Sequence, residues 1–130
     1  MTSRAIARTV ATAAFLFTFM GAGMAVEPRE IQGSWRLVSV DGQAVEAGDA
    51  QPHFSIEGDM ISGFDGCNRF GGPLGGPITV GQRACAGGYV PLPLDLSDLA
   101  AHLAGTRLQG DELLLPARAD FPASVFRRAE

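Results

Sequence analysis

Short stretches in which apolar and polar residues alternate recur along the chain from residue 34 onward. Such alternation is typical of strands with one buried face. Turn dipeptides separate several of these stretches, namely Asp41-Gly42, Gly58-Asp59 and Gly110-Asp111. The sequence therefore predicts seven or eight short strands, which we place at 34–40, 43–46, 53–57, 60–64, 78–80, 106–109, 112–115 and 123–128.

One stretch, residues 94–108, has helical periodicity instead. Asp95 or Ser97 could cap its N-terminus, and Gly105 is a natural C-terminal cap. His102 falls on the side of the pattern that we expect to be exposed. The residues expected to face the sheet are Leu96, Leu99, Ala100, Leu103 and Ala104.

Strands that follow one another through tight turns predict an antiparallel meander. The expected fold is therefore mainly β (α+β), a curved sheet or partly open barrel with one packed helix. Glycines interrupt the run 65–72 and predict bulges or close approach of backbones. Trp35 in the first strand is expected to be a core residue, with stacking on a ligand as the alternative.

The first 25 residues have the pattern of a secretory signal peptide. Arg4 and Arg8 precede an almost wholly apolar run at 10–20, and small residues follow up to Ala25. We expect cleavage after Ala25 and export to the periplasm or beyond, with an uncleaved membrane anchor as the alternative. The apolar run is shorter than the roughly 20 residues that span a bilayer comfortably, so no stable membrane span is expected after cleavage.

The remaining residues, 26–130, are enough for one small domain and too few for two. They carry 8 basic and 14 acidic residues, a net charge near −6. Because a domain this acidic gains little from contacts with phosphates, nucleic acid is not an expected partner. We expect a monomer.

Two cysteines in an exported domain predict one disulfide, Cys67–Cys85. Closing a loop of about 19 residues would stabilise the fold by roughly 3 kcal/mol. The alternative is a reactive thiol pair, but redox motifs usually separate their cysteines by two residues.

Neither histidine has the neighbours that a catalytic site requires. No serine lies in a Gly-x-Ser-x-Gly elbow, and His53 and His102 are far from each other in the sequence. Two cysteines and two distant histidines do not have the spacing of a zinc site. We therefore expect no enzymatic activity, no metal and no cofactor.

Several motifs together resemble the META domain, the family of the heat-shock protein HslJ. They are an early strand with Trp35 and Leu37, the segment Gly66-Cys67-Asn68-Arg69-Phe70-x-Gly72, and Arg83-Ala84-Cys85 downstream. The resemblance extends over about residues 33–128. It implies a small exported or membrane-tethered domain linked to envelope stress, without an established enzymatic reaction.

The polar groups around the cysteines are the candidate site. A disulfide would bring Asn68 and Arg69 close to Arg83. These groups could hold the bulged backbone, with the arginines paired to Asp65 or to carbonyls. They could instead form a binding surface for an anion or a peptide, composed of Asn68, Arg69, Arg83, Phe70 and Tyr89.

Two functions follow from these observations. The first is a non-catalytic module that binds an envelope protein or peptide, or acts structurally under stress. The alternative is a small-ligand-binding barrel whose open end lies near Phe64, Phe70 and Tyr89.

Overall fold

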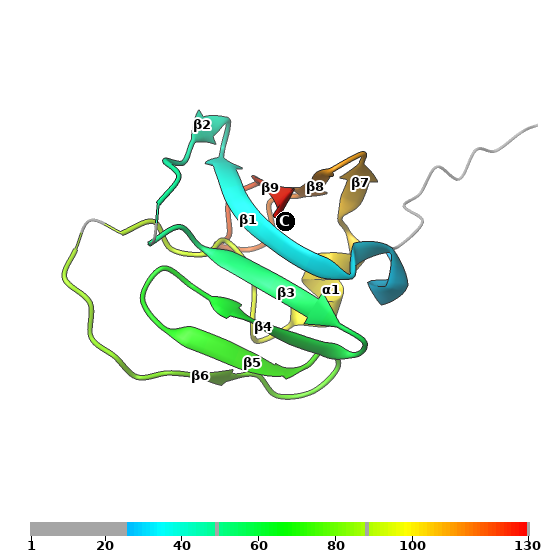
Figure 1. The fold of residues 1–130 in the computed structure, drawn as a ribbon, viewed down its shortest axis with the longest axis horizontal. Helices are drawn as coiled ribbons and strands as arrows, with labels where there is room; N and C mark the ends of the chain where they lie inside the picture. Colours follow the sequence, from blue (N-terminus) through cyan, green and yellow to red (C-terminus); the bar gives the residue numbers. More distant parts are fainter. Residues whose placement is uncertain (1–25, 49, 88, 130) are drawn as a thin grey trace, which may run out of the picture.

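The computed structural model describes residues 26–48, 50–87 and 89–129; the expected signal peptide lies outside these residues. The described chain folds into a curved antiparallel sheet with one short α-helix (Figure 1). Its elements are η1 (Pro28–Ile31), β1 (Gly33–Val40), β2 (Gln43–Ala44), β3 (His53–Glu57), β4 (Met60–Phe64), β5 (Arg69–Pro73), β6 (Thr79–Val80), α1 (Leu99–Ala104), β7 (Arg107–Gln109), β8 (Glu112–Leu115) and β9 (Ser124–Ala129). The expectation of a mainly β fold with one packed helix is confirmed, with nine strands among the described residues instead of seven or eight.

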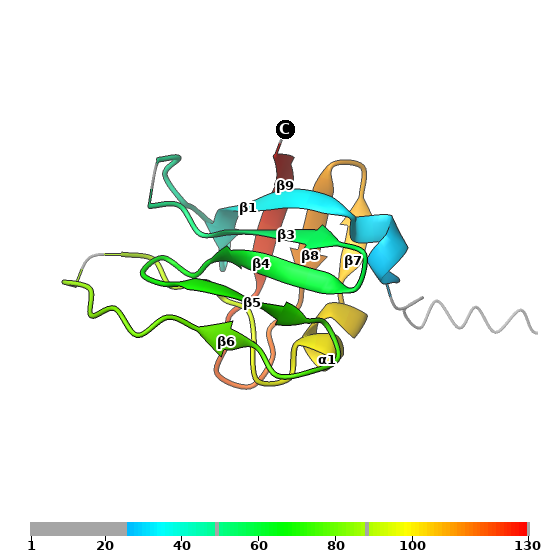
Figure 2. The same ribbon diagram turned by 60° about the horizontal axis from the view of Figure 1, so that its bottom comes forward.

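Strand β1 occupies the middle of the sheet although it comes first in the chain. The order is β6-β5-β4-β3-β1-β9-β8-β7, with β2 paired to one end of β1. Two meanders, β3 to β6 and β7 to β9, therefore meet along β1. Figure 2 shows these two groups of strands crossing at a steep angle, which gives the sheet its curvature. A shift in register between Leu37 and Ser39 marks an irregularity where β1 pairs with β9.

The concave side of the sheet holds the hydrophobic core. Trp35 and Leu37 of β1 are fully buried there, as are Phe54 of β3 and Phe126 of β9. The rings of Phe54 and Phe126 meet edge to face, with centroids 5.0 Å apart. Trp35 is thus a core residue, as expected, and its indole Nε1 donates to the carbonyl of Ile31 (3.0 Å).

The helix is much shorter than the sequence predicts. Residues 94–98 precede it as a loop because the Asp95 carboxylate accepts the amide hydrogens of Ser97 (3.1 Å) and Asp98 (3.2 Å) and so holds a turn. Leu94 and Asp95 of this loop are buried, whereas Ser97 and Asp98 are exposed. Asp98, not Asp95 or Ser97, occupies the N-cap position, while Gly105 is the C-cap as expected.

The expected orientation of the helix is also wrong in part. Leu99 and Leu103 pack into the core, whereas Ala100 and Ala104 are exposed. His102, expected on the exposed side, is only 1% exposed. Alanine and histidine occur on both buried and exposed faces of helices. The spacing of apolar residues therefore placed the buried face about one residue away from its position in the structure. Within the described residues, no helix is both long and apolar enough to cross a membrane.

Gly63 of β4 lies where two aromatic core residues converge. It is opposite Phe54 on one side and Phe70 on the other. A Cβ at this position would lie 2.7 Å from Cζ of Phe70 and 2.9 Å from Cα of Phe54. Backbone atoms cannot move aside as a flexible side chain can, so the fold requires glycine here.

We therefore predict that Gly63→Ala lowers the free energy of unfolding by about 3 kcal/mol, the upper range for an overpacked core. Gly75→Ala is the matched control, because a Cβ at Gly75 would have no neighbour within 4 Å. Urea denaturation of both variants checks this. Equal stabilities of the two variants would contradict the packing argument.

Candidate functional site

The segment between β4 and β5 is a tight turn held by one carboxylate. Oδ1 of Asp65 accepts the backbone amide hydrogens of Cys67 (2.9 Å) and Asn68 (2.6 Å), and the Asp65 amide donates to the Asn68 carbonyl (2.9 Å). Gly66 within this turn has φ of +102°, a conformation that L side chains rarely adopt. The turn fixes the direction in which Cys67 and Asn68 leave the sheet.

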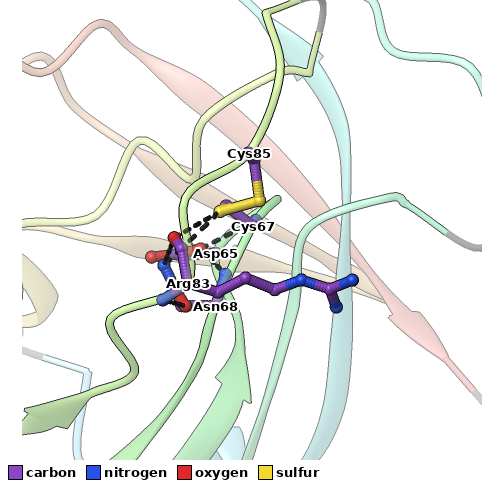
Figure 3. The surroundings of a disulfide bond; sticks show 5 residues. All are labelled: Asp65, Cys67, Asn68, Arg83 and Cys85. Carbon is purple, nitrogen blue, oxygen red and sulfur yellow. Dashed lines mark hydrogen bonds between the residues drawn. A yellow bond between two sulfur atoms is a disulfide. The ribbon is translucent and has the colours of Figure 1, made fainter.

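The disulfide Cys67–Cys85 joins this turn to the segment after β6, as the sequence predicts. Asn68 reinforces the link from its side chain (Figure 3): its Nδ2 donates to the Arg83 carbonyl (3.0 Å), and the Arg83 amide donates to Asn68 Oδ1 (2.6 Å). The side-chain amide therefore continues the pairing of β5 with β6 beyond the end of the strand. We call residues 65–68 and 83–85 the stapled segments.

The arginine side chains do not take the structural role that the sequence suggested for them. The Asp65 carboxylate accepts backbone amide hydrogens, so it does not pair with Arg69 or Arg83. Figure 3 shows the Arg83 side chain extending away from the disulfide while its backbone faces Asn68. Among the described residues, neither guanidinium has an ion-pair or hydrogen-bond partner.

After Cys85 the chain folds back, and residues 89 and 90 lie against Gly66. A Cβ on Gly66 would lie 2.5 Å from the Val90 carbonyl oxygen and 3.0 Å from the Tyr89 ring. The Leu92 amide then donates to the Asp65 carbonyl (2.9 Å). These contacts position Tyr89 and Val90, whose side chains are 42% and 39% exposed.

The loop that follows is anchored by a buried histidine. Nδ1 of His102 accepts the amide hydrogen of Asp95 (3.0 Å), so the proton of the neutral ring is on Nε2, which lies 3.3 Å from the Pro116 carbonyl. Burial is the main cause that lowers the pKa of His102; Arg118 lowers it further, and the Pro116 carbonyl and Asp95 oppose the shift. The ring is therefore held neutral, as an acceptor.

Asp95 is the second polar residue of this anchor. Its carboxylate accepts the Ser97 hydroxyl hydrogen (2.6 Å), which is the main cause that lowers the pKa of Asp95. Nε of Arg118 lies 3.6 Å from Asp95 Oδ2, and Nη2 of the same arginine donates to Asp98 Oδ2 at 2.7 Å. Sequence patterns gave no sign of this network, since its members come from three separate segments of the chain.

A groove of about 590 Å³ lies between the stapled segments and this anchored loop. Polar groups line it on the staple side, and the loop contributes apolar side chains together with Asp95 and Ser97. Its residues are Asp65, Cys67, Asn68, Arg83, Ala84, Cys85, Tyr89, Pro91, Leu92, Leu94, Asp95, Leu96, Ser97 and Phe121. We call it the staple groove.

A second hollow, of about 320 Å³, adjoins the staple groove at Cys67, Asn68 and Arg83. Its other lining residues are His53, Phe64 and Arg69. The structure thus places four of the five residues of the expected surface around the two hollows: Asn68, Arg69, Arg83 and Tyr89.

The fifth residue of that surface, Phe70, lies elsewhere. It is 5% exposed and belongs to the core. Its ring faces the concave side because it alternates with Arg69 along β5. Among residues 26–48, 50–87 and 89–129, no group of three or more His, Cys, Asp or Glu side chains could hold a metal ion.

Comparison with known proteins gives one result. The family model described as META domain matches residues 29–130. No curated protein and no solved structure gives a significant match.

The neutral His102 predicts a pH-dependent stability. Because its pKa in the folded protein is below the ordinary value of 6.5, the unfolded chain binds more protons in the range below pH 6.5. Stability from this group is fully present above that pH and is lost as the pH falls. We expect a slope of up to about 1.4 kcal/mol per pH unit between pH 6.5 and 5.

Urea denaturation of the wild type and of His102→Asn at pH 7.5, 6 and 5 measures this slope. The variant keeps an acceptor near the Asp95 amide but does not titrate, so its slope in this range should be smaller. His53→Asn is the control, since it replaces the exposed histidine, which has no contact with the His102 anchor. A wild-type slope that survives in His102→Asn argues against the anchor.

Proposed function

Because this chain belongs to the META domain family, we propose that it is an exported, non-catalytic module that binds a protein or peptide partner at the staple groove. The resemblance to the HslJ family links such a module to stress of the cell envelope. The single observation that carries the proposal is the presentation of Tyr89 and Val90. Both are exposed and lie against Gly66, and Tyr89 lines the staple groove beside Pro91 and Leu92.

Exposed aromatic side chains in fixed positions are typical anchors of protein interfaces. A tyrosine provides a large contact area and loses little conformational entropy on binding. The disulfide and the Asn68–Arg83 hydrogen bonds restrict the segment before binding, which lowers the ordering cost that a flexible loop would incur. The groove therefore suits recognition of a short segment of a partner.

The alternative, a small ligand inside the curved sheet, has less support. Trp35, Phe54 and Phe126 fill the concave side and are fully buried. The polar and apolar surfaces suited to recognition lie outside this core, around the stapled segments. The packing therefore favours a surface groove over an internal site.

Export is supported by the disulfide and by the N-terminal pattern of the sequence. Stable disulfides are uncommon in reducing compartments, and cleavage after Ala25 would leave Val26 as the first residue. We predict that the protein recovered from the envelope fraction of an expressing bacterium starts at Val26 by N-terminal sequencing. Ala25→Phe should prevent cleavage because the site requires a small residue. Recovery of wild-type protein that begins at Met1 would support the retained-anchor alternative.

Partner binding is tested by cross-linking and affinity capture from an envelope extract. We predict that Tyr89→Ser with Val90→Ser reduces capture of the partner about tenfold, as expected for loss of an interface anchor. Met60→Ser is the matched control, since Met60 is 52% exposed on β4 and does not line the staple groove.

The same variants separate binding from a stress role. A deletion strain complemented by the control variant should tolerate heat and envelope stress as the wild type does, and complementation by the double variant should fail. Equal capture by the two variants would exclude the staple groove as the binding site. Reduced capture with equal complementation would instead show that stress tolerance does not depend on this binding.

A further inference from the structure

The outer face of the sheet carries a line of four residues. Its middle members, His53 and Phe64, stack on each other with ring centroids 5.9 Å apart, and the arginines at its two ends have no ion-pair or hydrogen-bond partner among the described residues. Arg36 of β1 is directly opposite His53 of β3, His53 is opposite Phe64 of β4, and Phe64 is opposite Arg69 of β5. Residues directly opposite each other in an antiparallel sheet project to the same face. We call these four residues the basic row; Figure 1 shows their strands side by side.

The two arginines of this row differ from those on the neighbouring strand β9. Arg127, the next residue along the same line on β9, has Nη2 3.7 Å from Glu112 Oε2. Arg128 stacks on Trp35, with Cζ 4.2 Å from the ring centroid, and donates to the Gln32 carbonyl. Within the described part of the chain, Arg36 and Arg69 have no such partner.

The row ends in the hollow beside the staple. Arg69 and Arg83 line it together with His53, Phe64 and Asn68, and the hollow has a volume of about 320 Å³. No carboxylate is among its lining residues. Two guanidinium groups and an aromatic ring are the groups that proteins use to bind a carboxylate with an apolar neighbour.

We propose that the basic row and this hollow bind a short acidic segment of a partner polypeptide in extended conformation. One carboxylate binds between Arg69 and Arg83 in the hollow, and another binds Arg36. Arg36 and Arg69 are three strand spacings apart, or about 14 Å at roughly 4.8 Å per strand. In an extended chain, residues i and i+4 are about 13 Å apart and point to the same side. A segment with acidic residues at i and i+4 therefore fits the row.

The length of the row favours a short segment over a long polyanion. At one end the line continues to Arg127, which is already paired with Glu112. At the other end β6 closes the sheet with Thr79 and Val80, which carry no charge. The chain as a whole has a net charge of −4, so a nucleic acid extending beyond the row would meet repulsion. A row one residue wide on a curved sheet also offers little contact to a flat anionic membrane.

This site is separate from the contacts that carry the proposed function. Tyr89 and Val90 do not line the hollow, and Arg36, His53, Phe64 and Arg69 do not line the staple groove. Only Cys67, Asn68 and Arg83 belong to both. Variants of Arg36 and Arg69 can therefore test the basic row without altering the groove.

The test measures binding of the purified protein to a fluorescent peptide of ten residues by anisotropy. The peptide has Glu at positions 3 and 7 in a Ser/Thr background, and its matched form has Gln at both positions. We expect the Glu peptide to bind at least about tenfold more tightly than the Gln peptide at low salt, and added salt to weaken it. Arg36→Gln with Arg69→Gln should remove this preference.

Arg107→Gln with Arg29→Gln is the matched control, because it removes the same charge from exposed positions outside the row. Thermal unfolding of each variant verifies folding, and Arg69→Gln alone serves if the double variant is unstable. Equal affinity for the two peptides would overturn the proposal, as would equal weakening in the control. Binding of oligouridylate or of vesicles with anionic lipid, without binding of the Glu peptide, would assign the row to a different partner and overturn it too.

Discussion

The pairing of β1 with strands on both of its sides is the interaction on which this fold depends. It joins two meanders that have few other connections: β3 pairs along one edge of β1, and β9 pairs along the other. The same strand contributes Trp35 and Leu37 to the core, both fully buried. Its alternate residues include Arg36, which projects to the opposite face. One strand thus determines the curvature, the core and the outer surface together.

The stapled segments are held together by a few side-chain interactions at the end of the β5–β6 pairing. Asp65 and Asn68 satisfy backbone groups where regular pairing stops, and the disulfide fixes the two segments covalently. Because these side chains are occupied in holding the backbone, the adjoining arginines are left for external contacts. The candidate site therefore combines a backbone fixed by the disulfide and by hydrogen bonds with two arginines, Arg69 and Arg83, whose side chains take no part in fixing it.

Much of this architecture could be predicted from the sequence because strand alternation and turn dipeptides are local signals. The bounds of β3 and β4 were predicted correctly, and so was the disulfide. The length of the helix was overestimated because the Asp95 carboxylate accepts the amide hydrogens of Ser97 and Asp98 and so replaces the first helical turn. The spacing of apolar residues carries no information about such side-chain hydrogen bonds. His102 could not be recognised as an anchor, since its partners at Asp95 and Pro116 come together only in the folded chain. The basic row was missed for the same reason: its members lie on three strands besides β1, and only the register aligns them.

The central position of β1 also constrains how the protein can acquire its structure. A hydrogen bond from Arg128 to the Gln32 carbonyl joins residues 96 positions apart, and β1 cannot complete its pairing until β9 is available. Folds dominated by such distant pairings form slowly. A chain of this kind stays unfolded while its last strand is still being delivered, which is the state in which a polypeptide passes through a narrow export channel. For the export proposed above, this topology would keep the chain competent for translocation and let the fold be completed after it.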